Sequence, residues 1–252
     1  MPHINQKEIN TLKRLEKSFS QKHYSGNTSK KQIFSFIDYH TFVCLTAPHA
    51  TNSTTYKRFK PVDRFTGALV TYLGEQNHFS YIVRNKYWHK KRTITSFIKK
   101  NNLSHHYFLD IHAMKDRPFD LAVGIGYCSK DVYKKELAII KRLCQKYGLK
   151  YVVNHPSYTG QPGLTGQLQR KISSTTVLQL EWTWAFRDFN NFPDKVTRTT
   201  IPFIRDLALS LNTLSKEPLP KKLSIRYTLF QKLKNKINWL KWCLFPQTSP
   251  KG

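Results

Sequence analysis

The chain has 252 residues, of which 39% are hydrophobic and 13% aromatic. That length suits one large α/β domain with extensions or two small domains, and the apolar content excludes a chain that is disordered throughout. Lysine and arginine outnumber acidic residues by 42 to 15, so the net charge is +27. Such a charge indicates an anionic partner (nucleic acid, a membrane surface or an acidic substrate) or only a well-solvated surface.

The four cysteines show neither a CxxC pair nor the spacing of a zinc ribbon: Cys44, Cys128, Cys144 and Cys243. The first three lie in apolar patterns, where free cysteine behaves as a small hydrophobe. We therefore expect no disulfide framework and a cytoplasmic location. The N-terminus lacks the apolar core of a secretion signal, and no run of about 18 apolar residues predicts a transmembrane helix.

The hydrophobic pattern predicts strands that alternate with helices. Residues 5–20 predict a charged helix and residues 21–32 a flexible link, so 1–32 form a basic N-terminal extension. Strands are expected at 42–47, 79–84, 107–114, 120–126, 150–154 and 176–182, and helices at 62–76, 91–101, 129–147 and 199–214. This alternation favours an α/β fold with a mostly parallel or mixed sheet and helices on both faces, in a catalytic domain spanning 33–214.

Polar side chains stand at the ends of four predicted strands. His49 follows the first, His112 closes the third, Asn154 ends the fifth and Glu181 lies near the end of the sixth. Ligands of such sheets bind beyond the carboxyl ends of the strands. We therefore expect a site at this edge.

The residue types suit a metal, although each has a structural alternative. Neutral imidazole is a common zinc ligand, but an isolated histidine at a strand end is more often a hydrogen-bonded structural residue. Asp63, at a predicted helix start, is either an N-cap or a carboxylate ligand. Asp110 shares a face with His112, two residues on, and either supports a ligand or is satisfied by backbone or arginine.

Glu181 lies in the apolar and aromatic segment VLQLEWTW. Burial would raise its pKa toward the range of a general base; the alternative is an ion pair with a lysine or arginine. Three glycines at 160, 163 and 166 match no phosphate-binding motif and predict a flexible loop over the site. No GxSxG motif is present, which argues against a serine hydrolase.

Together these segments resemble the N-formylglutamate amidohydrolase family, a relative of the zinc carboxypeptidases in fold. The resemblance covers about residues 42–190, in the family's order. The matching positions are Pro48-His49, Asp63, the element Asp110-x-His112-Ala113-Met114, the loop with Asn154, Pro156, Tyr158 and Gly160, and the pair Gln179 and Glu181. Arg84 matches a family arginine, but the Asp-Leu-Asn-Arg element that usually follows is absent.

The resemblance implies a zinc-dependent enzyme that hydrolyses an amide bond, other than a peptide bond, in an N-acyl amino acid or a related small acidic substrate. It implies that zinc is held by His49, Asp63 and His112 and that Glu181 is the catalytic base. Arg84 and Arg117 are candidates to grip the substrate carboxylate. Four further residues are expected to support ligands or bind substrate: Asp110, Asn154, Tyr158 and Gln179.

The C-terminal tail, residues 215–252, differs in kind from the rest. It is strongly basic, and a stripe of apolar residues recurs at helical spacing: Leu229, Leu233, Ile237, Leu240 and Leu244. This predicts an amphipathic helix over 221–245 that either lies on an anionic membrane or packs on the catalytic domain. The second candidate function is therefore a non-catalytic or weakly catalytic scaffold that binds an anionic surface. Nucleic acid is not expected, because no nucleic-acid-binding motif accompanies the charge.

Overall fold

The computed structural model describes residues 5–55, 58–87, 93–103, 105–161, 163–169 and 175–215. The predicted tail therefore lies outside the described residues except for Ser215, as do residues 91 and 92 of the third predicted helix.

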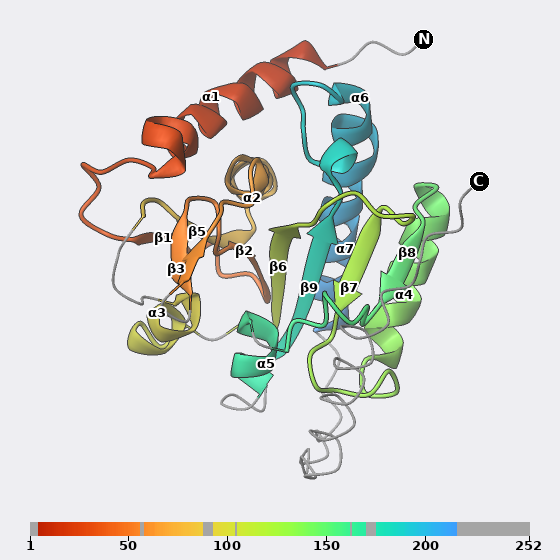
Figure 1. Ribbon diagram of the computed structural model, residues 1–252. Helices are drawn as coiled ribbons and strands as arrows, with labels where there is room; N and C mark the ends of the chain where they lie inside the picture. Colours follow the sequence, from red (N-terminus) through yellow and green to blue (C-terminus); the bar gives the residue numbers. More distant parts are fainter. Residues whose placement is uncertain are drawn as a thin grey trace.

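A seven-stranded mixed sheet forms the centre of the molecule (Figure 1). Its order is β1 (Phe34–Ile37), β5 (Ser80–Arg84), β2 (Val43–Ala47), β6 (Tyr107–Ala113), β9 (Thr176–Trp182), β7 (Leu121–Gly124) and β8 (Tyr151–Val153). The central four, β5, β2, β6 and β9, are parallel, whereas β1 pairs antiparallel with β5 and β7 pairs antiparallel with β9. The predicted α/β class with a mixed sheet is confirmed.

Helices cover both faces of this sheet. One face carries α2 (Thr66–Asn77), α4 (Lys134–Lys146) and α7 (Ile201–Leu214), and the other carries α3 (Ile94–Lys100) and α5 (Leu164–Gln169). Short segments at Trp184–Phe186, α6 (Pro193–Lys195) and a π-helical turn (Val196–Thr200) lead into α7. In the part of the chain that the structure describes, no helix combines the length and apolar character needed to cross a membrane.

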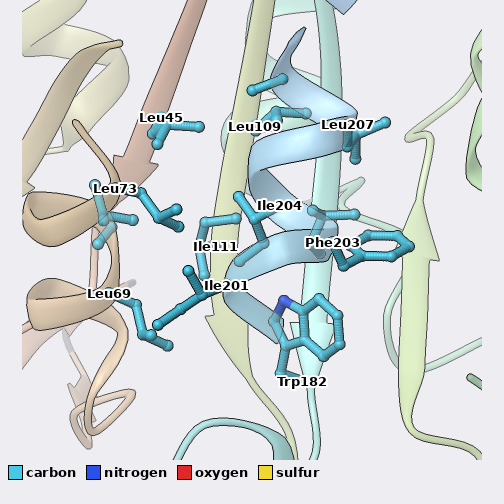
Figure 2. Close-up of a cluster of buried hydrophobic side chains, with 14 of the residues drawn as sticks. Leu45, Leu69, Leu73, Leu109, Ile111, Trp182, Ile201, Phe203, Ile204 and Leu207 are labelled. Atoms are coloured by element: carbon cyan, nitrogen blue, oxygen red, sulfur yellow. The ribbon is translucent and has the colours of Figure 1, made fainter. Parts of the chain in front are cut away.

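The larger core lies on the face covered by α2 and α7. Figure 2 shows Ile201, Ile204 and Leu207 of α7 beside Leu109 and Ile111 of β6. None of these five side chains is more than 5% exposed. Burial of each contributes about 1.5–3 kcal/mol, so the contacts on this face are a main source of the stability of the fold.

Helix α1 (Gln6–Tyr24) packs against α2 and buries Ile9, Leu12 and Phe19 in the same core. Its regular backbone stops at Gln21, the start of the predicted link. In Figure 1 the helix lies across the top of the view, above α2. The segment expected to be an extension thus shares the core of the sheet domain, and the division at 32 and 214 stays a prediction.

Glu16 joins α1 to the start of α2. Its Oε1 accepts hydrogen bonds from the Tyr24 hydroxyl at 2.8 Å and from the Phe65 amide at 3.1 Å. Burial raises the pKa of Glu16 to about 7, although these two hydrogen bonds act in the opposite direction. Phe65 has φ of +72°, a strained conformation for a bulky residue, so the turn before α2 depends on such contacts.

Several short elements, β1 among them, were not predicted. A small hairpin of β3 (Ser53–Thr55) and β4 (Arg58–Lys60) lies between β2 and α2. The glycine-containing segment 155–166 was expected to be a flexible loop, but its last residues begin α5, and Gly166 lies inside that helix. The described residues of this segment before Leu164 do form a loop, as predicted, and its flexibility stays a prediction. Hydrogen bonds join the loop and α5 to the residues after β7: Gly126 donates to the Thr159 carbonyl at 2.7 Å, and Gln169 donates to the Ile125 carbonyl at 2.8 Å.

Candidate active site

Three neighbouring strands change from apolar to polar on one face as they approach their carboxyl ends. On the face covered by α3 and α5, β2, β6 and β9 first contribute Cys44, Phe108 and Val177 to a buried cluster. Side chains alternate between the faces of a strand. The next residues on this face are therefore the polar ones: Thr46, Asp110, His112, Gln179 and Glu181.

His112 lies between two carboxylates. Its Nδ1 is 2.8 Å from Asp63 Oδ2, and its Nε2 is 2.9 Å from Asp110 Oδ2. Burial disfavours the charged ring, but Asp110 and Asp63 outweigh it and raise the pKa of His112 to about 10. Burial likewise opposes ionisation of Asp63, yet Lys60 and His112 hold the pKa of Asp63 well below its usual range. The His112 ring therefore has one carboxyl group on each of its two nitrogens.

Asp63 reaches His112 from the loop that precedes α2. Its amide donates to the His49 carbonyl at 2.8 Å, which ties this loop to the end of β2. The side chain does not cap α2: the cap position is Phe65, which makes no side-chain cap hydrogen bond. The N-cap role of Asp63 is therefore excluded, and its role as a metal ligand stays a prediction.

His49 stands beside His112, with ring centroids 5.2 Å apart. Its Nδ1 is 3.0 Å from the Ser53 hydroxyl in β3. Burial, with Lys60 nearby, holds the pKa of His49 well below its usual value. His49 is consequently neutral, the form in which imidazole binds metal ions.

Glu181 is opposite His112 in the pairing of β9 with β6. Gln179, on the same face, donates its amide to Glu181 Oε1 at 2.5 Å. Burial raises the pKa of Glu181 to about 7, and the neighbouring His112 acts against this rise. A carboxyl group that titrates near neutrality is suited to act as a general base.

Asp110 orients His112 through the ring nitrogen that does not contact Asp63. It is fully buried, and its Oδ1 accepts a hydrogen bond from the Thr46 hydroxyl at 2.5 Å, while Oδ2 contacts His112 Nε2. The ring is therefore held with Nδ1 facing Asp63. A carboxylate on the second nitrogen is the usual partner of a metal-ligating histidine.

The two arginines expected to grip a substrate lie in different surroundings. Arg84 is 4% exposed, and its Nε donates to the Pro48 carbonyl at 2.8 Å while its guanidinium lies over the Phe34 ring. It thereby supports the loop that carries His49. Arg117 is exposed, and its Nε is 3.4 Å from the Tyr158 hydroxyl. Of the two, Arg117 is the one with its side chain open to solvent.

Asn154 does not join the histidines. The strand before it, β8, is parallel to β7, and β7 runs opposite to β9. The residue pairing places Asn154 near the level of Gln179, two strands away from β9. Its side chain accepts a hydrogen bond from the Ile125 amide at 2.9 Å. The expectation that it ends a strand at the same edge as His112 is corrected by this antiparallel insertion.

The structure adds two cations that the sequence did not single out. Lys60 Nζ is 3.8 Å from Asp63 Oδ2. Arg187 is buried, and Asp63 and Glu181 are among the acidic groups that act on it. Lys60 precedes Asp63 by three residues, but nothing distinguishes it among the 42 basic residues. Arg187 lies after the last strand, in a segment whose sequence shows no helical or strand periodicity that would predict its burial.

The donor chemistry suits zinc, since two histidines and one carboxylate, His49, His112 and Asp63, are ligands that it takes in catalytic sites. Asp110 adds the supporting carboxylate, and the buried acidic groups favour a cation. The spacing of these side chains does not match that of a bound metal: among the described residues no group of three or more His, Cys, Asp or Glu side chains is arranged to hold a metal ion. The direct His112–Asp63 hydrogen bond occupies two of the three donors.

No protein-family model matches the chain, and no curated protein matches it. Solved structures do. A bacteriophage poly-gamma-glutamate hydrolase is 14% identical with a TM-score of 0.48, covering 75% of this chain and 91% of its own. The N-formylglutamate amidohydrolase from Ralstonia eutropha JMP134 is 12% identical with a TM-score of 0.47, covering 74% and 99%. A metallo-carboxypeptidase from Burkholderia cenocepacia is 11% identical with a TM-score of 0.42, covering 86% and 70%.

Proposed function

We propose that the protein is a metal-dependent hydrolase that cleaves the amide bond of an N-acyl amino acid or a related small acidic substrate. The observation that carries the proposal is the convergence of His49, Asp63 and His112 beside Glu181. These residues come from the turn after β2, the loop before α2, β6 and β9, and their side chains are largely buried. A cluster of this composition is costly to bury unless its charges are paired or used.

His49, Asp63 and His112 would hold the metal, which we propose to be zinc. When bound, zinc would lower the pKa of a water molecule and polarise the scissile carbonyl. Asp110 keeps His112 in the orientation that presents Nδ1. Binding requires His112 to give up the proton it shares with Asp63, so metal uptake releases protons.

Glu181 supplies the base. Its carboxylate accepts a proton from the attacking water and later gives it to the leaving nitrogen, so the amine departs in neutral form. Gln179 holds Oε1 of this carboxylate at 2.5 Å and limits its rotation. The pKa of about 7 leaves an appreciable fraction of Glu181 ionised at neutral pH.

Arg117 and Tyr158 are proposed to bind the substrate's carboxylate. They lie within 3.4 Å of each other, and the Tyr158 ring packs beside His155. A guanidinium and a phenol hydroxyl together offer several donors to a carboxylate. The net charge of +27 favours the approach of an anionic substrate.

The test is hydrolysis of a panel of N-acyl amino acids, with release of the free amine measured. Protein loaded with zinc should turn over at least one acidic member, chelator-treated protein should not, and added zinc should restore activity. Arg117→Ala should raise KM for that substrate more than it lowers kcat, because a binding contact is lost. A zinc-loaded protein that hydrolyses none of the panel, or activity indifferent to chelation, would contradict the proposal.

A second candidate is a non-catalytic scaffold on an anionic surface, favoured by the His112 contacts: both ring nitrogens are held by carboxylates, as in a structural ion pair. Here the basic segment 221–245 is proposed to bind an anionic membrane, each near-surface lysine adding about 1 kcal/mol. The intact chain should sediment with vesicles containing phosphatidylserine at low salt, and a chain ending at Ser215 should remain in the supernatant. Equal sedimentation of the two chains would exclude this role of the tail.

A further inference from the structure

Arg187 has a guanidinium that contacts three separate segments of backbone. It follows β9, is 7% exposed and lies over the Trp184 ring. Its N–H groups donate to the carbonyls of Arg64 at 3.1 Å, Trp182 at 3.4 Å and Met114 at 3.5 Å. The first bond has an ordinary length and the other two are long. One planar group with five donors thus spans the loop before α2, the end of β6 and the end of β9.

Each of these carbonyls belongs to a residue next to the candidate site. They follow Asp63 by one residue, His112 by two and Glu181 by one. A shift of any one segment would move the corresponding side chain relative to the other two. The contacts of Arg187 therefore span the three elements whose spacing decides whether the site can assemble.

The chemistry of the side chain suits this role. A guanidinium presents its donors in a fixed fork, so it can serve several carbonyls at once, whereas an ammonium on a flexible stem cannot reproduce the three directions. Its charge also faces the acids of the site: burial lowers the pKa of Arg187, while Asp63 and Glu181 act in the opposite direction.

We propose that Arg187 is a positioning residue, whose hydrogen bonds to the carbonyls of Arg64, Met114 and Trp182 set the spacing between Asp63, His112 and Glu181. The inference rests on the proposed metal-dependent hydrolase. It assigns no contact between Arg187 and substrate or metal.

The experiment compares Arg187→Met and Arg187→Lys with Ile204→Ala. The lysine variant keeps the charge and loses the fork. Ile204 is fully buried on the opposite face of the sheet, so its truncation lowers the melting temperature without touching the site. Two readouts are taken on the full chain, below the melting transition of every variant. One is the affinity for zinc, from competition with a chelator. The other is the NMR signal of the His112 Nδ1 proton in zinc-free protein, assigned by its loss in His112→Ala.

Both Arg187 variants should bind zinc about 10–100-fold more weakly than the wild type, as is typical when a supporting partner of a metal site is removed. Both should also lose or shift the His112 signal, while Ile204→Ala preserves affinity and signal. Wild-type affinity in Arg187→Met, full rescue by lysine, or an unchanged His112 signal would overturn the proposal. If the wild type binds no zinc, the proposed function fails, and the His112 signal alone then decides the role of Arg187.

Discussion

Replacing Glu181 with glutamine should reduce kcat by at least about a thousandfold and leave zinc content and the melting temperature close to those of the wild type. Glutamine has nearly the same shape but cannot accept the proton of the attacking water, and general-base catalysis contributes typically 10²–10⁴-fold. The loss of a charge beside the reacting atoms adds to this effect. Steady-state kinetics on the substrate found in the panel, with metal analysis of the same preparation, make the measurement.

Glu136→Gln is the matched control for this variant. Glu136 is a buried carboxylate that accepts a hydrogen bond from the Tyr107 hydroxyl at 2.9 Å, and it lies in α4, on the other face of the sheet. Its replacement should leave kcat within about twofold, since the hydrogen bond can be kept by the amide oxygen. Turnover by Glu181→Gln within tenfold of the wild type would remove Glu181 from the proton-transfer step.

Changing His49 and His112 together to alanine should abolish tight zinc binding, where the wild type is expected to hold about one zinc per chain. Two of three proposed ligands are lost, so the affinity should fall by more than the roughly 10–100-fold that follows loss of a supporting partner. Elemental analysis after dialysis measures the amount of zinc bound per chain. Titration against a chromophoric chelator measures the affinity for zinc.

His105→Ala provides the comparison. His105 is as buried as His112, and its Nδ1 is 2.9 Å from the Thr41 carbonyl. His105 lies just before the start of β6, whereas His112 lies near the end of that strand. Its loss should cost stability but no zinc. Zinc retained undiminished by the His49 and His112 double variant would show that the metal, if one is bound, sits elsewhere.

The sequence by itself determined the main strands and the placement of His49, His112 and Glu181 at their carboxyl ends. Those features are local. A short apolar run predicts a strand. Successive side chains of a strand point to opposite faces, so the sequence also predicts which side chains share a face. The face that carries Val177 therefore also carries Gln179 and Glu181, whatever the neighbouring strands do.

Only the tertiary structure decided which strands are neighbours and in which direction they run. β7 is antiparallel to β9, which separates Asn154 from the other polar strand ends. No local pattern distinguishes an antiparallel insertion from one more parallel strand, because strand direction depends on the path of the whole chain.

The contacts that assemble the site are of the same long-range kind. His112 and Asp63 are 49 residues apart, and Arg187 reaches the Arg64 carbonyl across 123 residues. The apolar stripe of the charged N-terminal helix can be seen in the sequence. The partner of its buried Glu16 cannot, because the Phe65 amide that donates to Glu16 lies 49 residues further along the chain. Composition and periodicity describe each partner separately. The packing of α1 on α2, and of the loops at the ends of β2, β6 and β9, brings the partners together.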